Sequence, residues 1–268
     1  MNIRTCVAGA VAVCVAIAVL SPPTRSSADP ILKPKKYTGP IPKKYFSFGI
    51  GAFGGAENAD MWDFLDRQVY GPMKSLTESD DFGAALSLDV CYAVKVHPQF
   101  AVRTRAGLAI LGADGKGVVD PNLPAPADTL LLAYDRSFDV LLFSIDATGL
   151  FFFQDASVKE FQTYIGGGFS LYLPYSKYTE DRADYDTGKP YNGYETSEWG
   201  FEPGVHAVLG MLYHFKPTLA LNLEGRVQMA QSKFEMEYLL PEPAGSQEIS
   251  FDVDYSGFIL SIGIAKFF

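Results

Sequence analysis

The chain has 268 residues, 48% of them hydrophobic, and its 31 acidic and 22 basic residues give a net charge of −9 at pH 7. This acidic balance argues against a nucleic-acid partner, because a protein that binds nucleic acid needs a basic face.

The N-terminus predicts a secretory signal peptide over residues 1–28. Arg4 supplies a basic start, an uncharged apolar run follows over 6–20, and small residues precede a cleavage site after Ala28. The apolar run is shorter than the roughly 20 residues that a membrane-spanning helix needs. We therefore expect export of the chain from the cytoplasm.

Residues 29–44 are rich in proline and lysine, and this composition predicts an extended periplasmic arm before a single domain over 45–268. Removal of the signal peptide would leave Cys91 as the one cysteine, so the exported chain must be stable without a disulfide. A closed barrel in a membrane would meet that requirement.

The stretch YFSFGIGAFGG contains Gly49-x-Gly51-x-x-Gly54, the spacing of a dinucleotide-binding loop. That motif is weak alone, because it needs a preceding strand, a following helix and a βαβ rhythm. Apolar residues instead alternate with small ones through this stretch, which favours a strand with its glycines facing inward. Glycine at such positions leaves room for a large neighbour or lets the strand bend.

Alternation with a period of two recurs along the rest of the chain. From Phe82 to Val96, leucine, valine and tyrosine share one face, and serine, aspartate, cysteine, alanine and lysine share the other. Strict alternation over this length predicts a strand rather than a helix, and a strand long enough to cross a membrane. About eight such segments follow one another: 45–55, 82–96, 99–112, 137–153, 159–174, 200–215, 217–233 and 256–268.

The connections between these segments also alternate in length. Three are short, near Pro98, 154–159 and Pro217, and four are long, over 56–81, 113–136, 175–199 and 234–255. An even number of strands with short periplasmic turns and long extracellular loops is typical of bacterial outer-membrane barrels. The sequence thus predicts an all-β, closed, antiparallel up-and-down transmembrane barrel, because strands cross hydrocarbon only where every backbone group is paired.

Aromatic residues are expected to mark both rims of this barrel, as interfacial girdles do. At strand ends beside the short turns lie Phe46, Phe100, Phe151, Phe153, Phe161, Tyr213, Phe215 and Phe268. For the opposite rim the sequence suggests Phe82, Tyr172, Phe201, Phe234 and Phe258.

The segments TYIGGGFSLYL, GVHAVLGMLYHFKPTLALNLEGRVQ and GFILSIGIAKFF resemble the small outer-membrane barrels, the OmpA-like, OmpX-like and OmpW-like superfamily. The resemblance covers nearly all of residues 29–268 and implies an outer-membrane location. It also implies a C-terminal signal that the barrel-assembly machinery recognises, here Leu260, Ile262, Ile264 and Phe268. Lys266 departs from the pattern, because that position is usually aromatic or apolar.

The inward positions of the expected strands hold both acids and bases. Their list is Asp89, Lys95, Arg103, Arg105, Asp146, Tyr164, His206, Asn222, Glu224 and Arg226. A barrel of eight strands has an interior that side chains fill, so we expect a buried, charge-paired polar network. The alternative is a narrow conduit for small or hydrophobic solutes, as in OmpW-like proteins.

A remote third hypothesis is an enzyme that modifies lipid A. Some barrels that this chain resembles do so with histidine, serine and an acid, and His206 with Ser170 would be the candidates here. A nucleophile and its base must lie within hydrogen-bond reach, and a shared fold is weak support for a shared reaction. We expect a non-catalytic protein without metal or cofactor.

The long loops are acidic and rich in tyrosine, as in YSKYTEDRADYDTGKPYNGYETSEW. Such loops favour solubility, and tyrosines also anchor binding partners. We expect contact with outer-membrane lipid and lipopolysaccharide, while the identity of an extracellular partner stays open.

Overall fold

The strands of the barrel follow the alternation seen in the sequence. The computed structural model describes residues 43–57, 78–79, 82–119, 132–153, 161–191, 193–239 and 246–268, all within the unit Ile41–Phe268. The predicted signal peptide, and the arm up to residue 42, lie outside the described residues. Within these ranges, no helix is long and apolar enough to cross a membrane.

The strands run in chain order with the following bounds: β1 (Lys44–Gly54), β2 (Glu78–Ser79), β3 (Ala85–His97), β4 (Phe100–Val119), β5 (Leu132–Phe152), β6 (Phe161–Asp184), β7 (Tyr194–Trp199), β8 (Glu202–Lys216), β9 (Leu219–Met229), β10 (Gln231–Leu239), β11 (Ser246–Asp254) and β12 (Gly257–Phe267).

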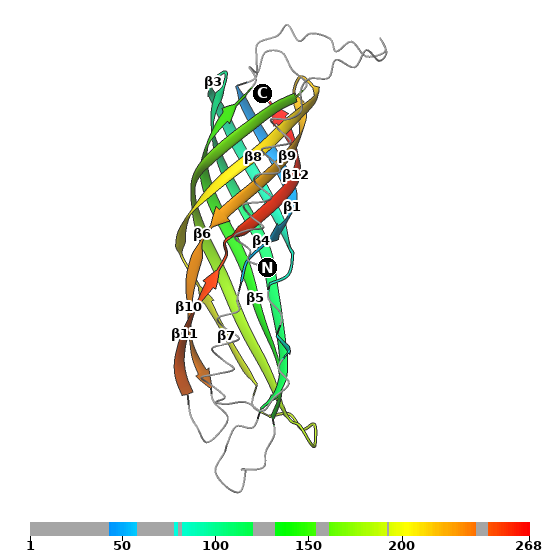
Figure 1. Cartoon of the computed structure of the whole chain (residues 1–268), viewed down its shortest axis with the longest axis vertical. Helices are drawn as coiled ribbons and strands as arrows, with labels where there is room; N and C mark the ends of the chain where they lie inside the picture. Colours follow the sequence, from blue (N-terminus) through cyan, green and yellow to red (C-terminus); the bar gives the residue numbers. More distant parts are fainter. Residues whose placement is uncertain are drawn as a thin grey trace. The chain divides into compact units, whose positions relative to one another are not determined.

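Eight of these strands form a closed ring in the order β4-β3-β1-β12-β9-β8-β6-β5, and β5 pairs with β4 to complete it. Every pair in the ring is antiparallel. Figure 1 shows these strands winding around one axis, with β1 beside β12. The prediction of a closed all-β barrel of about eight strands is confirmed.

Ring closure depends on the first and last strands. They pair without a break from Tyr45↔Phe267 to Gly54↔Phe258. The four residues of the expected assembly signal, Leu260, Ile262, Ile264 and Phe268, all face outward and are exposed. Lys266 faces outward in the same row, so the departure from the family pattern lies on the outer surface.

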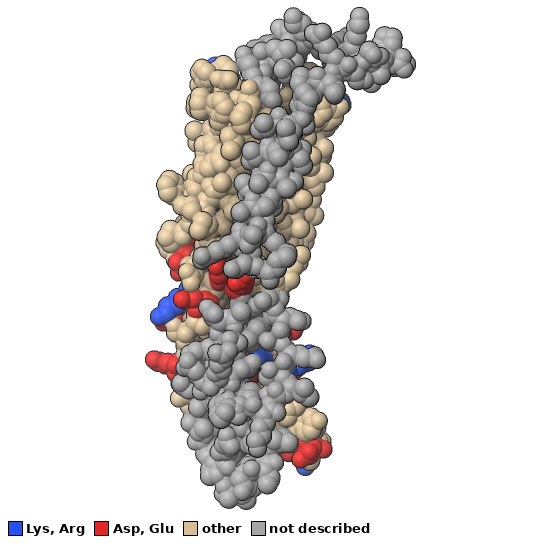
Figure 2. All heavy atoms as spheres, in the orientation of Figure 1, with Lys and Arg blue, Asp and Glu red and all other residues tan. Residues whose placement is uncertain are grey.

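Side chains alternate between the inside and the outside of the barrel. Outward positions carry large apolar residues that are exposed, up to 76% for Phe169, whereas inward positions are buried. On the face seen in Figure 2, charged residues are scarce over the barrel and gather toward the end where β10 and β11 lie. This belt is the surface that a transmembrane barrel presents to lipid.

Gly49 and Gly51 of the Gly-x-Gly-x-x-Gly motif are inward residues of β1. A Cβ added at Gly49 would lie 2.9 Å from the carboxylate oxygens of Asp89 on β3, so glycine here makes room for an inward acid. Both neighbours of β1 are antiparallel to it. The dinucleotide-binding alternative needs a βαβ unit with parallel strands, and the structure contradicts it.

All four predicted long loops contain strand residues, with the short β2 in the first of them, so their boundaries were wrong. β4 continues to Val119, β5 begins at Leu132 and β6 reaches Asp184, while β7 and the β10–β11 hairpin occupy the rest. The alternation persists there, but the outward residues become polar, as with Asp139 opposite Lys177. The apolar outer face that marked the strands disappears once they leave the expected lipid belt.

The extended strands and the β10–β11 hairpin share a hydrophobic core, which we call the aromatic cap. Phe138 of β5 lies at its centre, with ring centroids 5.4 Å from Phe234, 6.0 Å from Phe251 and 5.8 Å from Phe82. Phe82, Tyr172 and Phe234, which the sequence suggested for an outer girdle, are therefore buried inside. That prediction was wrong, because the alternation along their strands directs these three side chains into the barrel.

Exposed aromatics do mark both ends of the belt. Beside the short turns, Phe100 contacts Phe151 at 5.1 Å and Phe161 contacts Tyr213 at 4.8 Å between ring centroids, as predicted. At the other end lies Trp199, which is 62% exposed and stacks on Phe143 at 6.0 Å.

The outward face of β6 offers a test of the lipid belt. Phe169 lies midway along it, so Phe169→Arg should cost the folded barrel about 2–4 kcal/mol, because a cation at the middle of a bilayer loses its hydration. Urea unfolding of protein folded into phosphatidylcholine vesicles, followed by the gel shift between folded and unfolded forms, measures this loss.

The matched control is Thr179→Arg, ten residues further along the same strand and on the same face, beyond the apolar belt. Its effect should be small. Equal losses for the two variants would contradict the position of the belt.

Candidate functional site

The interior of the barrel is layered, and the inward residues of β5 show the order. Phe152 and Leu150 come first, Thr148, Asp146 and Ser144 follow, and Leu142, Val140 and Phe138 come last. The first group belongs to an apolar cluster at the short-turn end, and the last belongs to the aromatic cap. We call the middle level, with the charged side chains that face it, the polar layer.

One part of the polar layer is centred on Glu224 of β9. Arg103 of β4 faces it with both terminal nitrogens, and its Nη2 donates to Glu224 Oε1 at 3.0 Å. The hydroxyl of Tyr164 on β6 donates to Glu224 Oε2 at 2.6 Å and contacts Asn222 Oδ1 at 2.8 Å. Arg103 is 1% exposed, so this paired carboxylate is what makes a buried guanidinium tolerable.

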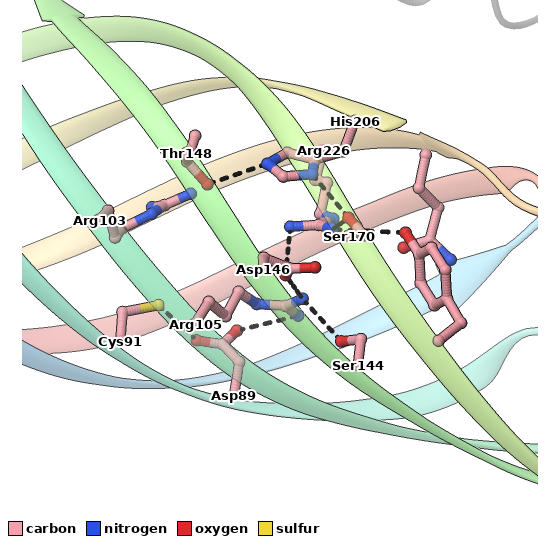
Figure 3. Close-up of polar contacts among 12 residues, drawn as sticks. Asp89, Cys91, Arg103, Arg105, Ser144, Asp146, Thr148, Ser170, His206 and Arg226 are labelled. Atoms are coloured by element: carbon pink, nitrogen blue, oxygen red, sulfur yellow. Dashed lines mark hydrogen bonds and ion pairs between the residues drawn. The ribbon is translucent and has the colours of Figure 1, made fainter. Parts of the chain in front are cut away.

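The second part is centred on Asp146 of β5, which lies between two arginines (Figure 3). Arg105 Nη1 contacts Asp146 Oδ2 at 3.0 Å, and Arg226 Nη1 contacts the same oxygen at 2.7 Å. A second acid, Asp89, lies 3.7 Å from Arg105 Nη2. Cross-strand register explains the first contact, because Arg105 and Asp146 are directly opposed in the β4–β5 pair.

His206 of β8 is held by two hydroxyls. Its Nδ1 lies 2.7 Å from Ser170 Oγ and its Nε2 lies 2.9 Å from Thr148 Oγ1. Arg226 Nη2 donates to Ser170 Oγ at 2.9 Å. Ser170 Oγ thus accepts from the arginine and shares a hydrogen bond with His206 Nδ1, and the tautomer of the ring decides which of the two atoms donates.

Lys95 lies on the side of the polar layer nearest the short turns. Its ammonium donates to Gln162 Oε1 at 3.2 Å and lies 4.7 Å from the centre of the Phe152 ring. This lysine thus joins the polar layer to the apolar cluster beside it through an amide and a cation–π contact.

Of the ten inward residues that the sequence suggested, nine are buried and Asn222 is half-buried. Direct contacts join eight of them into the two groups around Glu224 and Asp146, whereas Lys95 contacts Gln162, and His206 reaches the Asp146 group through Ser170. The sequence list omitted several polar partners that share the inward parity: Ser144, Thr148, Gln162, Ser170, Tyr172 and Gln228. The alternation of inward and outward positions along each strand is enough to identify these residues.

A second buried polar cluster lies in the extended strands and was not predicted. Glu180 of β6 accepts from Arg182 Nε and from the Tyr178 hydroxyl, and Arg136 stacks over Tyr134 at 4.6 Å. These residues fall in segments that the sequence assigned to loops, where no inward parity could be applied.

The polar layer contains a small cavity. Beside Arg105 lies a cavity of about 10 Å³, lined by Ser87, Leu108, Ala109, Leu142, Ser144, Tyr172, Gln228 and Ile259, which has room for about one water-sized molecule. Within the described part of the chain, no cluster of three or more His, Cys, Asp or Glu side chains could hold a metal ion.

The Arg103–Glu224 pair offers a test of the polar layer. Glu224→Ala should destabilise the barrel by about 3–5 kcal/mol, because it leaves Arg103 buried without its acid. The double variant Arg103→Met/Glu224→Leu removes both charges and should recover most of that loss. Urea unfolding in vesicles compares the two, and a double variant as unstable as the single one would contradict the pairing.

The sequence matches no protein-family model and no curated protein. Among solved structures, the chain is similar to the outer membrane protein OprG from Pseudomonas aeruginosa, with a TM-score of 0.53, 13% identity, and coverage of 86% of this chain and 98% of that chain.

Two further likenesses have lower TM-scores. Neisserial surface protein A is 13% identical with a TM-score of 0.40, over 84% of this chain and 97% of that one. The outer membrane protein AlkL is 17% identical with a TM-score of 0.35, over 88% and 95%. The closed ring and the likeness to OprG together show that the chain has the fold of the small outer-membrane β-barrels.

Proposed function

We propose that the protein is an integral membrane protein of the bacterial outer membrane, with a structural or surface-interaction role and no catalysis. The fold supports the membrane position, since an exposed apolar belt surrounds a buried polar interior. The observation that carries the role is the layered interior, in which apolar side chains close both sides of the polar layer. Because side chains fill the interior of this barrel, we expect the protein to act through its outer surfaces.

The extended strands supply such a surface. Their outward face is charged, with Lys116 paired to Asp135 at 2.8 Å and Lys177 paired to Glu195 at 3.0 Å. The aromatic cap beneath makes this surface a packed sheet. We expect lipopolysaccharide and an extracellular partner to meet it, and the barrel-assembly machinery to act on the chain during insertion.

A closed interior predicts no ion conduction. In planar lipid bilayers, the purified protein should show no stable channel openings, because the layers at Phe152 and Phe138 exclude water from both sides. Frequent openings of constant size would contradict this role. A bilayer with an established open porin, recorded in the same salt, serves as the positive control.

The alternative is a conduit for hydrophobic solutes, and one observation favours it. The aromatic cap is a continuous cluster of buried hydrophobic side chains, so a solute that displaced the β10–β11 hairpin would meet an inner wall rich in aromatic rings. Liposomes that carry the protein would then take up a hydrophobic solute faster than empty liposomes do. Equal uptake by liposomes with and without the protein would contradict the conduit hypothesis.

The remote alternative is modification of lipid A by His206. The observation in its favour is the Ser170–His206 hydrogen bond of 2.7 Å. Against it, both side chains are buried inside the barrel, and Arg226 donates to the serine, which stabilises the hydroxyl as an acceptor instead of freeing it to attack. An acyl chain of lipid A cannot reach them without opening the wall.

His206→Ala should therefore leave the acyl pattern of lipid A unchanged in cells that express it. Mass spectrometry of extracted lipid A, compared with cells that carry the unaltered chain and cells that lack it, measures this. A pattern that differs with the unaltered chain and reverts in His206→Ala would establish the enzymatic alternative.

A further inference from the structure

Three exposed lysines lie at neighbouring strand ends beside the short turns. Lys44 begins β1, Lys216 ends β8, and Lys266 is the penultimate residue of β12. On the face seen in Figure 2, the charged atoms visible at this rim are basic. β1 and β12 are neighbours in the ring, and β9 alone separates β12 from β8.

Strand register places the three lysines on the same outer face. Lys216 is opposite Leu219, and Leu219 is opposite Lys266, and residues directly opposite in a pair share a face. A register shift between His214 and Lys216 brings Lys216 to this face. Lys44 precedes the inward Tyr45 and so faces outward as well.

The three lysines also lie close together. Two strand spacings separate Lys216 from Lys266, which amounts to roughly 10 Å. Lys44 is the diagonal neighbour of Lys266, because Lys266 is opposite Phe46, and diagonal neighbours lie about 7–8 Å apart. Flexible side chains of this length can bring three ammonium groups to one ligand.

The described segments at this end supply no acidic side chain to these lysines. None of the three lysines forms a salt bridge with a described residue. The described segments at this end contain no Asp or Glu: 43–48, 92–104, 147–153, 161–167, 209–221 and 262–268. Lysines at the opposite end differ, since Lys116, Lys177 and Lys233 each pair with an acid within 3.0 Å.

Aromatic rings fix the depth of the lysines relative to the lipid. Phe46 is opposite Lys266, and Phe268, beside Lys44, stacks on Tyr92 at 6.5 Å between centroids. Such rings lie at the boundary between acyl chains and headgroups. The ammonium groups therefore extend to the level of the lipid phosphates.

Among the described outward residues of this rim, the charge lies on one side. Around β4, β5 and β6 the outward positions at the same level carry Phe100, Phe151, Phe153 and Phe161. A general attraction of the barrel to a negative membrane surface would need only lysines spread around the whole ring. Three lysines at the ends of β1, β12 and β8, with β9 alone between the last two strands, instead form a local site.

We propose that Lys44, Lys216 and Lys266 form a binding site for the headgroup phosphate of an anionic phospholipid, in the leaflet that meets the short turns. An ammonium group is a compact charge that suits a phosphate, and the apolar belt beneath holds the acyl chains. The inference rests on the membrane position proposed above, but not on whether the barrel conducts or catalyses.

Native mass spectrometry of the folded protein in micelles tests the site. The probes are phosphatidylglycerol and phosphatidylcholine of the same acyl chains, and inorganic phosphate. The unaltered chain should retain phosphatidylglycerol in preference to phosphatidylcholine, and Lys44→Gln/Lys216→Gln/Lys266→Gln should reduce that retention by at least about tenfold, because each lysine near an anionic surface contributes several-fold.

The matched control is Lys116→Gln/Lys177→Gln/Lys233→Gln, which removes the same charge from the opposite end and should leave retention unchanged. Equal losses in both triple variants, or no loss in either, would overturn the site. Displacement of the lipid by millimolar inorganic phosphate would overturn it in favour of a site for free phosphate. The gel shift of the folded form confirms that each variant is folded before the lipid is added.

Discussion

The rest of the structure depends on the pairing of β1 with β12. Within a bilayer, a strand edge has no water to satisfy its N–H and C=O groups, and each unpaired group costs several kcal/mol. The unbroken register from Tyr45↔Phe267 to Gly54↔Phe258 removes both edges at once. Closure then divides the side chains into two sets, because every second residue must face lipid and the others must fill a narrow interior.

That division explains why charges are buried at all. The outward set has to be apolar, and a solid apolar interior would remove the contrast between faces that specifies the strand register. A slip of one residue in the β4–β5 pair would exchange Arg103 and Arg105 for Val102 and Thr104. The arginines would then face hydrocarbon, at about 2–4 kcal/mol each near the bilayer centre. The polar layer thus penalises the wrong register.

The sequence predicts the barrel well because its main determinant is local. Alternation within β3 or β9 needs no knowledge of distant residues, and the inward parity of Arg103, Glu224 and Arg226 follows from it. Which acid meets which base does not follow. Glu224 pairs with Arg103, 121 positions away in the chain, because ring order and strand stagger bring β9 across the interior from β4.

The sequence prediction failed where the environment changes along a strand. Beyond Ile110 and Leu141 the outward residues become Gly112, Asp114 and Asp139, so the apolar alternation that identifies a membrane strand is lost while the strand continues. Phe138 and Phe234 looked like rim residues for the same reason, since aromatics at a strand end suit either a girdle or a core. Only the spatial arrangement of β10 and β11 against β5 distinguishes the two.

The two ends of the barrel differ in how their lysines are paired. At the end with the extended strands, Lys116, Lys177 and Lys233 each pair with an acid of the protein. At the short-turn end the lysines have no acid among the described residues beside them, and like charges on adjacent strands repel. At the depth set by Phe46 and Phe268, lipid phosphates are groups that can supply a counter-charge from outside the chain.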